Sequence, residues 1–186
     1  MNNYMIDVET LGLGPDSVML SIGAVKFNTH GISNTFYAEL SLEEEIKNNY
    51  KIDAYAFKFW SAQKTAMPIN GVFTREGVNK GLINFINKAC FEPRSIWCNG
   101  TDFDIPIIQE GFKKSNLELP WKYNEVRDCR TVFKLFKNLV EPPPTTGDKH
   151  NALEDCKWQA TYLINILNTL KIYSSGFACA ELIKDW

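Results

Sequence analysis

The order of strand-like and helix-like segments is the feature that most limits the fold of this chain. Segments 4–8, 17–27 and 35–40 have the buried or alternating apolar residues of β-strands. Only short turns separate them, which predicts an antiparallel meander. Helical and strand-like segments alternate after residue 41. We therefore expect an α/β fold with a mixed central sheet, first an antiparallel meander and then parallel strands, flanked by helices.

Capping residues and apolar spacing predict the later elements. Ser41, with Glu44 three residues later, is typical of a capping box at a helix start, and Asp53 is a second candidate cap, for a helix over 53–63. The apolar pattern predicts further helices over 78–89, 105–114, 131–139 and 151–170. It also predicts strands over 95–98 and 126–129.

Length and composition favour one compact domain. The chain has 186 residues, 45% of them hydrophobic, and no linker divides it, so we expect a single domain over residues 1–186. Five cysteines without C-x-x-C spacing argue against a disulfide framework and a zinc site. The chain shows neither a signal-peptide pattern at its start nor an apolar run near the roughly 20 residues of a membrane span. These features predict a cytoplasmic protein that has no membrane partner.

The charge balance permits a nucleic-acid partner without indicating one. The net charge is −2, whereas proteins that coat long duplexes usually have a strong basic excess. If four of the 22 acidic side chains bind cations, 18 remain to offset 20 basic ones. Such a surface suits a few nucleotides at a strand end better than a long polyanion.

The first candidate motif, Asp7-Val8-Glu9-Thr10, lies at the end of the first expected strand. If the strand continues through it, the alternation of side chains places Asp7 and Glu9 on one face. Two carboxylates on one face repel each other unless a cation lies between them, so the motif indicates a metal site. The alternative is that the strand ends earlier and both groups are solvated at a turn.

The second candidate is Asp104, which follows the strand over 95–98 and precedes a helix. Functional residues of α/β proteins cluster at this edge of the sheet. Asp104 also precedes Ile105-Pro106, a suitable helix start, so it could be an ordinary helix cap, and Asp102 competes for that role. Taken alone, the capping role is favoured.

The third candidate pair is His150 and Asp155, at the start of the longest expected helix. Near a cluster of metal-bound acids, His150 would accept a proton at neutral pH. The alternative makes His150 a surface-loop residue and Asp155 a solvated acid, although apolar residues flank Asp155 and make solvation less favourable. His30, in a polar turn, is expected to be a solvated loop residue.

The combined order of these motifs resembles the DEDDh exonucleases of the DnaQ-like superfamily, which have a ribonuclease H-like fold. The four acids and the histidine of that family correspond to Asp7, Glu9, Asp104, Asp155 and His150. Residues 53–63, 96–104 and 127–131 resemble a subgroup that contains the phage DexA-type exonuclease and small bacterial 3′–5′ exoribonucleases. The wider family has histidine-asparagine where this chain has Asn99-Gly100, so contacts at that pair are not carried over.

The resemblance implies a 3′–5′ exonuclease that hydrolyses phosphodiester bonds at single-stranded 3′ ends of RNA or DNA and releases nucleoside 5′-monophosphates. Two divalent metal ions, Mg²⁺ or Mn²⁺, suit its oxygen ligands. Asp7 would bridge both ions, with Glu9 and Asp155 on one of them. Asp104 would help to orient the other ion, and His150 would take the proton from the attacking water.

The resemblance also implies substrate contacts. Glu9, Thr10 and Leu11 match the positions that contact the terminal 3′-hydroxyl and wedge against the last base. Phe103 and Trp60 are candidates for base stacking, although a position in the core is favoured for both. No residue is identified that would read a 2′-hydroxyl, so the sequence favours neither RNA nor DNA.

Three further segments have a predicted role. Arg127 and Arg130 flank Asp128 and would either contact phosphates or form an internal salt bridge with Asp128. Segment 141–149, with three prolines and a glycine, is expected to be a flap that moves over the substrate. The apolar segment 172–186 is expected to pack on the domain or on a second subunit, and a homodimer would fit some relatives.

Two other functions remain as alternatives at this point. A degenerate nuclease fold could serve as a nucleic-acid-binding module, but such a module has no need for four converging acids. A ribonuclease H-type endonuclease would share the metal chemistry. The setting of His150 before Asp155 favours the exonuclease branch.

Overall fold

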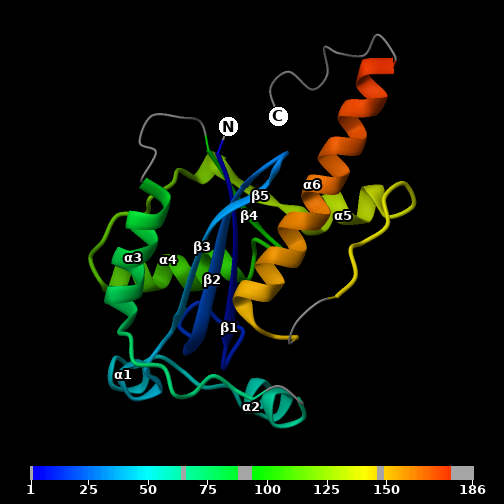
Figure 1. The fold of residues 1–186 in the computed structure, drawn as a ribbon. Helices are drawn as coiled ribbons and strands as arrows, with labels where there is room; N and C mark the ends of the chain where they lie inside the picture. The colour runs from blue at the N-terminus through cyan, green and yellow to red at the C-terminus, as the bar shows by residue number, and fades with distance from the viewer. Residues whose placement is uncertain (1, 64–65, 88–93, 146–148, 177–186) are drawn as a thin grey trace.

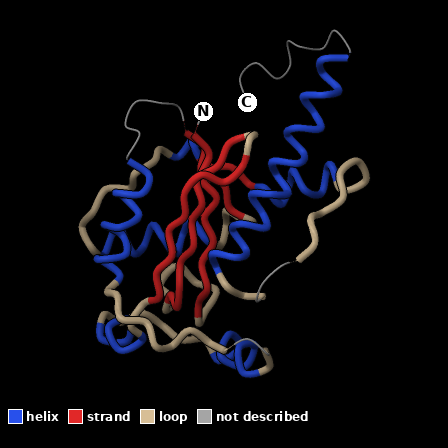
Figure 2. Tube along the Cα trace, viewed as in Figure 1, coloured by secondary structure: helices blue, strands red, loops and turns tan. Residues whose placement is uncertain are grey.

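The computed structural model of the protein describes residues 2–63, 66–87, 94–145 and 149–176. Figures 1 and 2 show a central sheet with helices on both faces. Within the described residues the sheet has five strands in the order β3-β2-β1-β4-β5. In chain order they are β1 (Asn2–Thr10), β2 (Met19–Asn28), β3 (Gly31–Glu39), β4 (Arg94–Cys98) and β5 (Val126–Asp128).

Strand direction divides the sheet into two parts. β1 is antiparallel to β2, and β2 is antiparallel to β3, which forms the expected meander. On its other side β1 is parallel to β4, and β4 is parallel to β5. The predicted α/β class and mixed sheet are therefore confirmed. The carboxyl ends of β1 and β4 point toward the same edge of the sheet, and β1 extends beyond β4.

Helices cover both faces of the sheet (Figure 1). The main ones are, in chain order, α3 (Arg75–Asn87), α4 (Asp104–Lys114), α5 (Cys129–Phe136) and α6 (Ala152–Gly176). Tyr4, Ile6 and Val8 of β1 are buried under α3 and α4, whereas Met5 is buried under α5 and α6. Full burial of each such side chain stabilises the fold by about 1.5–3 kcal/mol. This burial fixes the register of β1, since a slip by one residue would reverse which side chains face α6.

Two short helices, α1 (Leu42–Lys47) and α2 (Ala54–Ser61), lie beyond the end of β1 (Figure 1). Both predicted caps are confirmed. The Ser41 side chain accepts a hydrogen bond from the Glu44 N–H at 3.4 Å, and the Asp53 carboxylate accepts one from the Tyr55 N–H at 2.6 Å. Trp60 anchors α2 in a third buried cluster.

Several boundaries differ from those predicted. β2 begins at Met19 because Ser17 forms only an isolated bridge, and α3 begins at Arg75, three residues early. The strand predicted to run to residue 129 ends at Asp128, whose carboxylate accepts a hydrogen bond from the Arg130 N–H at 2.8 Å and so starts α5. α5 ends at Phe136, not at residue 139.

Some predictions fall on residues outside the described part of the chain. They concern residues 88–89 of a predicted helix, residues 146–148 of the predicted flap and the side chains of segment 172–186. The homodimer stays a prediction. No helix in the described part of the chain is long and apolar enough to cross a membrane.

Candidate active site

Asp7 and Glu9 both belong to β1, which continues to Thr10. They are therefore not solvated residues of a turn. Alternate residues of a strand share a face, so Asp7 and Glu9 lie on the same side as Met5, which packs under α6. Both side chains are partly buried. The strand thus presents two carboxylates to the start of α6.

Gly23 allows α6 to approach these carboxylates. It lies opposite Asp7 in the register of β1 and β2. A Cβ atom at Gly23 would lie 2.4 Å from the carbonyl carbon and oxygen of Ala152, the first residue of α6. Only glycine leaves room for the helix backbone here, so the start of α6 lies directly over β2 beside Asp7.

Asn151 fixes where α6 begins. Its side-chain oxygen accepts hydrogen bonds from the N–H groups of Leu153 at 3.1 Å and Glu154 at 3.2 Å, which satisfies two free donors of the first turn. Asp155 follows in that turn. Its position over β1 results from this cap together with the close approach at Gly23.

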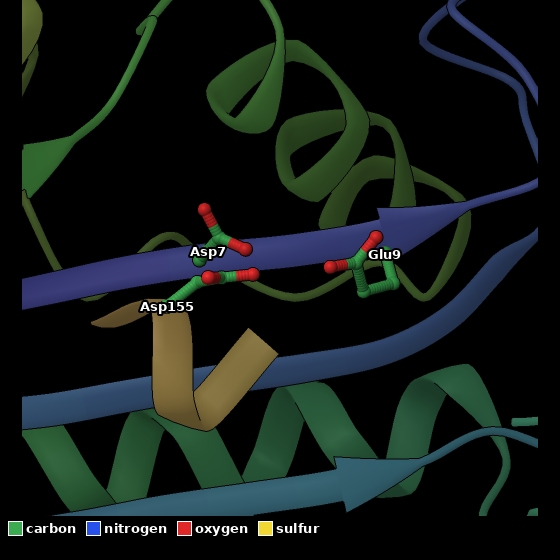
Figure 3. Close-up of side chains that lie close together, drawn as sticks. All are labelled: Asp7, Glu9 and Asp155. Carbon is green, nitrogen blue, oxygen red and sulfur yellow. The ribbon is translucent and has the colours of Figure 1, made fainter. Parts of the chain in front are cut away.

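Asp7, Glu9 and Asp155 form a compact carboxylate cluster. One oxygen from each lies within 4.8 Å of the other two. Figure 3 shows Asp7 and Glu9 on β1 and Asp155 reaching toward them from the first turn of α6. Carboxylates this close repel one another unless they are protonated or share a cation. The cluster therefore suits a divalent cation.

Asp104 completes the set of four acids from the other side of β1. Its Oδ1 accepts a hydrogen bond from the Val8 N–H at 3.2 Å, beyond the point where the pairing of β1 with β4 ends. The favoured alternative, that Asp104 is an ordinary helix cap, is wrong, because α4 begins at Asp104 and the side chain binds β1 instead. Asp104 is 3% exposed, whereas Asp102 is exposed to solvent.

Burial raises the pKa values of all four acids, and the charges of the other acids raise those of Asp7 and Glu9 further. Burial, followed by the charges of Asp104 and Glu9, raises the pKa of Asp7 well above its ordinary value. Burial and the charge of Asp155 raise the pKa of Glu9 to about 8. Burial raises the pKa of Asp104 to about 7 and that of Asp155 above its usual range. A bound cation would reverse these shifts, since carboxylates bind metals in the ionised form.

Gln159 is part of this site, although sequence reasoning did not identify it. Its Nε2 donates a hydrogen bond to Asp7 Oδ1 at 3.0 Å, and this bond favours the ionised form of Asp7. Gln159 is 4% exposed, and its Oε1 has no hydrogen-bond partner in the described residues. The available signal was its spacing of four residues from Asp155, which puts both on one face of α6.

His150 lies in the turn before α6, with a left-handed φ of 63°. Its ring packs edge-on against Phe59, with centroids 5.0 Å apart, and against Trp60 at 6.1 Å. Burial raises the pKa of Asp155, and His150, first through its charge and then through its backbone N–H, lowers it by a smaller amount. Helix α2 thus holds the histidine beside the acids, a contact that the sequence analysis did not predict.

A cavity of about 430 Å³ joins these groups. All four acids, His150 and Gln159 line it, together with Phe103, Arg130 and Lys149. Pockets for small ligands usually have volumes of about 300–1,000 Å³, so the cavity has room for a nucleotide.

Only some of the predicted substrate-binding residues line the cavity, and the others are buried elsewhere. Phe103 is partly buried and lines the cavity. Thr10 and Leu11 are 8% and 1% exposed and do not line it. The core position favoured for Trp60 is confirmed, since it is 3% exposed and its Nε1 donates to the Thr10 carbonyl at 3.0 Å.

The two arginines make different contacts. Arg127 donates to backbone carbonyls at residues 124 and 126, at 2.6 and 2.9 Å. Arg130 donates to the Asn99 carbonyl and lines the cavity. Neither forms the alternative salt bridge with Asp128 in the described part of the chain, where Asp128 caps α5.

A mixed sheet in this strand order, with four acids and a histidine lining one cavity, is the arrangement that the resemblance to the DEDDh exonucleases implies. Residues 2–167 match the family described as the 3′–5′ exoribonuclease Rv2179c-like domain. The chain belongs to this family. The family, the fold and the enzyme class expected from the sequence are thereby confirmed.

Three known nucleases are also similar to this chain in sequence or in fold. The exodeoxyribonuclease of Enterobacteria phage T4 is 24% identical over 193 residues, which cover 84% of this chain and 85% of the relative. The nuclease domain of 3′hExo, a DEDDh family member solved with rAMP, has a TM-score of 0.63 at 17% identity and covers 90% of this chain and 92% of that one. Cell-death related nuclease 4 has a TM-score of 0.66 at 17% identity, with 90% of this chain covered. This chain spans only 64% of that nuclease.

Proposed function

We propose that this protein removes nucleotides one at a time from single-stranded 3′ ends of RNA or DNA by a two-metal-ion mechanism. The observation that supports it best is the approach of Asp7, Glu9 and Asp155 to within 4.8 Å of one another, in a cavity that Asp104 and His150 also line. The family description names an exoribonuclease and the phage relative is an exodeoxyribonuclease, so both polymers are candidate substrates.

The donor set fits hard divalent cations. Carboxylate oxygens are the ligands that Mg²⁺ and Mn²⁺ prefer. Asp7, Glu9 and Asp155 would hold one ion, and Asp7 and Asp104 would help to hold the other. Bound ions of this kind neutralise the phosphate and lower the pKa of water. The raised pKa values of Glu9 and Asp104 agree with a site that is complete only with cations present.

His150 is the proposed general base. Its ring lies in the cavity beside Asp155, and the contacts with Phe59 and Trp60 restrict its orientation. The oxygen of a water molecule forms a bond to phosphorus while the bond to the 3′ oxygen breaks, and His150 accepts the proton that the water loses. The 3′ oxygen that leaves phosphorus takes a proton from solvent and becomes the 3′-hydroxyl of the shortened strand. The released nucleotide keeps its 5′-phosphate.

The size of the cavity agrees with release of single nucleotides. A volume of about 430 Å³ has room for one nucleotide. Phe103 offers an aromatic ring on which a base can stack. Glu9, at the end of β1, would contact the terminal 3′-hydroxyl.

The direct test uses 5′-labelled single-stranded RNA and DNA with Mg²⁺, with Mn²⁺ or with a chelator. We expect a ladder that shortens from the 3′ end and that disappears with the chelator. Products from internal cuts, or an intact substrate in every condition, would contradict the proposal.

Substitution of the two histidines tests the assignment of the base. His150→Ala should lower kcat by roughly 10²–10⁴-fold, the usual contribution of a general base, and should still bind metal. His30→Ala is the matched control, because His30 lies in the exposed turn between β2 and β3. If the His150→Ala enzyme turned over at the rate of the His30→Ala enzyme, another group would be the base.

A further inference from the structure

Arg130 reaches from α5 to the edge of the cavity that the four acids line. It lies in the first turn of α5, whose start is fixed by the hydrogen bond from the Arg130 N–H to the Asp128 carboxylate at 2.8 Å. Its Nη2 donates to the carbonyl oxygen of Asn99, just after β4. The side chain is thereby held across the gap between α5 and β4.

Gly100 provides the space for this guanidinium group. Its φ of +118° is unfavourable for other residues, and a Cβ atom there would lie 2.5 Å from Arg130 Nη2 and 2.9 Å from Cζ. Any side chain at position 100 would displace the arginine. Asn99-Gly100 is the pair at which this chain departs from the pattern of the wider family, and in this structure it forms the binding position of Arg130.

The positive charge of Arg130 is not neutralised by a salt bridge in the described part of the chain. Arg130 is exposed to solvent and lines a cavity whose other charged groups are mostly acids. Its charge lowers the pKa of Asp104, against the larger opposite effect of burial. Because the guanidinium has five N–H donors, the contact with Asn99 leaves others for an anionic ligand.

Arg127 provides a contrast within the same segment. It is only three residues away, but Nη1 donates to the backbone carbonyls of Asn124 and Val126 at 2.6 and 2.9 Å. Arg127 is partly buried and does not line the cavity. Arg130 is therefore exposed at the cavity, where it can contact a substrate, whereas Arg127 is not.

We propose that Arg130 binds a phosphate group of the substrate strand at the edge of the metal site. The inference rests on the proposed exonuclease function and identifies a further substrate-binding residue for it. A planar guanidinium binds two phosphate oxygens at once, and the Asn99 carbonyl and Gly100 fix its orientation before substrate arrives.

Steady-state kinetics on a labelled single-stranded oligonucleotide with Mg²⁺ test the proposal. Arg130→Ala should lower kcat/KM by roughly ten- to hundredfold, as expected for a lost hydrogen bond to a charged group. Arg130→Lys should restore part of that loss, since lysine keeps the charge but not the two-point contact. Gly100→Ala should give a loss like that of Arg130→Ala. Arg127→Ala, the matched control, should keep the wild-type value.

Salt dependence separates a phosphate contact from a structural role. The slope of log kcat/KM against log salt should become shallower by about 0.7 in Arg130→Ala, the value for one phosphate contact on a single strand. A wild-type kcat/KM in Arg130→Ala would overturn the inference. A lower kcat/KM with an unchanged slope would also overturn it. An inactive wild-type enzyme would contradict the proposed function instead.

A substrate with a single phosphodiester, thymidine 5′-p-nitrophenyl phosphate, locates the contact. If Arg130→Ala is also defective on this compound, Arg130 binds the reacting phosphate. If the defect is confined to the oligonucleotide, Arg130 binds a neighbouring phosphate. Either result supports a phosphate contact. Wild-type activity of Arg130→Ala on both substrates would contradict it.

Discussion

At the scale of single residues, the acids that would bind metal also destabilise the metal-free fold. Asp104 is 3% exposed, and burial raises its pKa to about 7. Near pH 8 it is ionised while buried, close to Asp7 and Glu9. Burial of a charge costs free energy, and the nearby charge of Arg130 offsets this cost only in part. The acid positions are therefore expected to trade stability against function.

Substitution of Asp104→Asn tests this trade. The amide removes the charge but keeps an oxygen that can accept the Val8 N–H. We expect the metal-free melting temperature at pH 8 to rise, by about 2–4 °C for each 1 kcal/mol gained. We expect kcat to fall by roughly a hundredfold or more, because the phosphate loses electrostatic stabilisation. Calorimetry and the nuclease assay measure the two effects.

Asp102→Asn is the control for that substitution. Asp102 is exposed and does not line the cavity, so neither the melting temperature nor kcat should change appreciably. If Asp104→Asn melted below the wild type at pH 8 without metal, burial of the charge would not be the dominant effect at this position.

The residues of the site were only partly predictable from sequence. The acids and His150 occur in short motifs whose spacing has a direct chemical reason. Gln159 contacts Asp7 across 152 residues of sequence, and no local pattern encodes such a contact. The burial of Leu11 likewise depends on Trp60 and Tyr50, which come from other segments.

At the scale of elements, the contact of β2 with α6 positions the carboxylates. Gly23→Ala would place a methyl group 2.4 Å from the backbone of Ala152, which cannot move independently of the helix. We expect a loss of about 1–3 kcal/mol in the free energy of unfolding. Because the shift would also separate Asp155 from Asp7, we expect weaker Mg²⁺ binding. Chemical denaturation and calorimetric titration measure these quantities.

Gly77→Ala is the matched control for Gly23→Ala. Gly77 is exposed in α3, and a Cβ atom there would meet only the Thr74 side chain, at 3.2 Å. Alanine in a helix is favoured over glycine by about 1 kcal/mol, so this variant should be as stable as the wild type or more so. Unchanged Mg²⁺ affinity in Gly23→Ala would show that the helix position does not control the cluster.

Elements were predictable where a local pattern determined them. Alternation identified the strands, and Ser41 and Asp53 identified two helix starts through their side-chain caps. The start of α3 was placed too late because Arg75 appears polar in the sequence. In the fold it is buried, and its Nε donates to Glu45 Oε1 at 3.1 Å. The start of the helix is also marked locally, because the Thr74 hydroxyl accepts a hydrogen bond from the Gly77 N–H at 3.1 Å, a cap that the apolar pattern did not reveal.

At the scale of the whole molecule, the sheet order brings distant acids together. β1 lies between β2 and β4, so residues that follow β4 and residues that start α6 both reach it. Asp7, Asp104 and Asp155 thus meet, although nearly 150 residues separate the first from the last. The alternation of strands and helices predicted an α/β class, but the order of strands required the three-dimensional structure.

This convergence predicts how the stability of the whole protein depends on pH. Folding raises the pKa of Glu9 from 4.5 to about 8 and that of Asp104 from 3.8 to about 7. A folded state with raised carboxyl pKa values binds more protons than the unfolded state, so its stability falls as pH rises. The raised pKa values contribute fully to the free energy of unfolding below about pH 4, which is the ordinary pKa range of these groups. It is lost progressively as pH rises toward 8.

We therefore expect the metal-free melting temperature to fall between pH 5 and pH 8, as measured by calorimetry with a chelator. Mg²⁺ or Mn²⁺ should raise it more at pH 8 than at pH 5, because cations bind the ionised acids. The double variant Glu9→Gln, Asp104→Asn should show a flatter pH dependence and a smaller response to metal. A metal-free protein whose melting temperature rose steadily over this range would show that these acids are already compensated without cations.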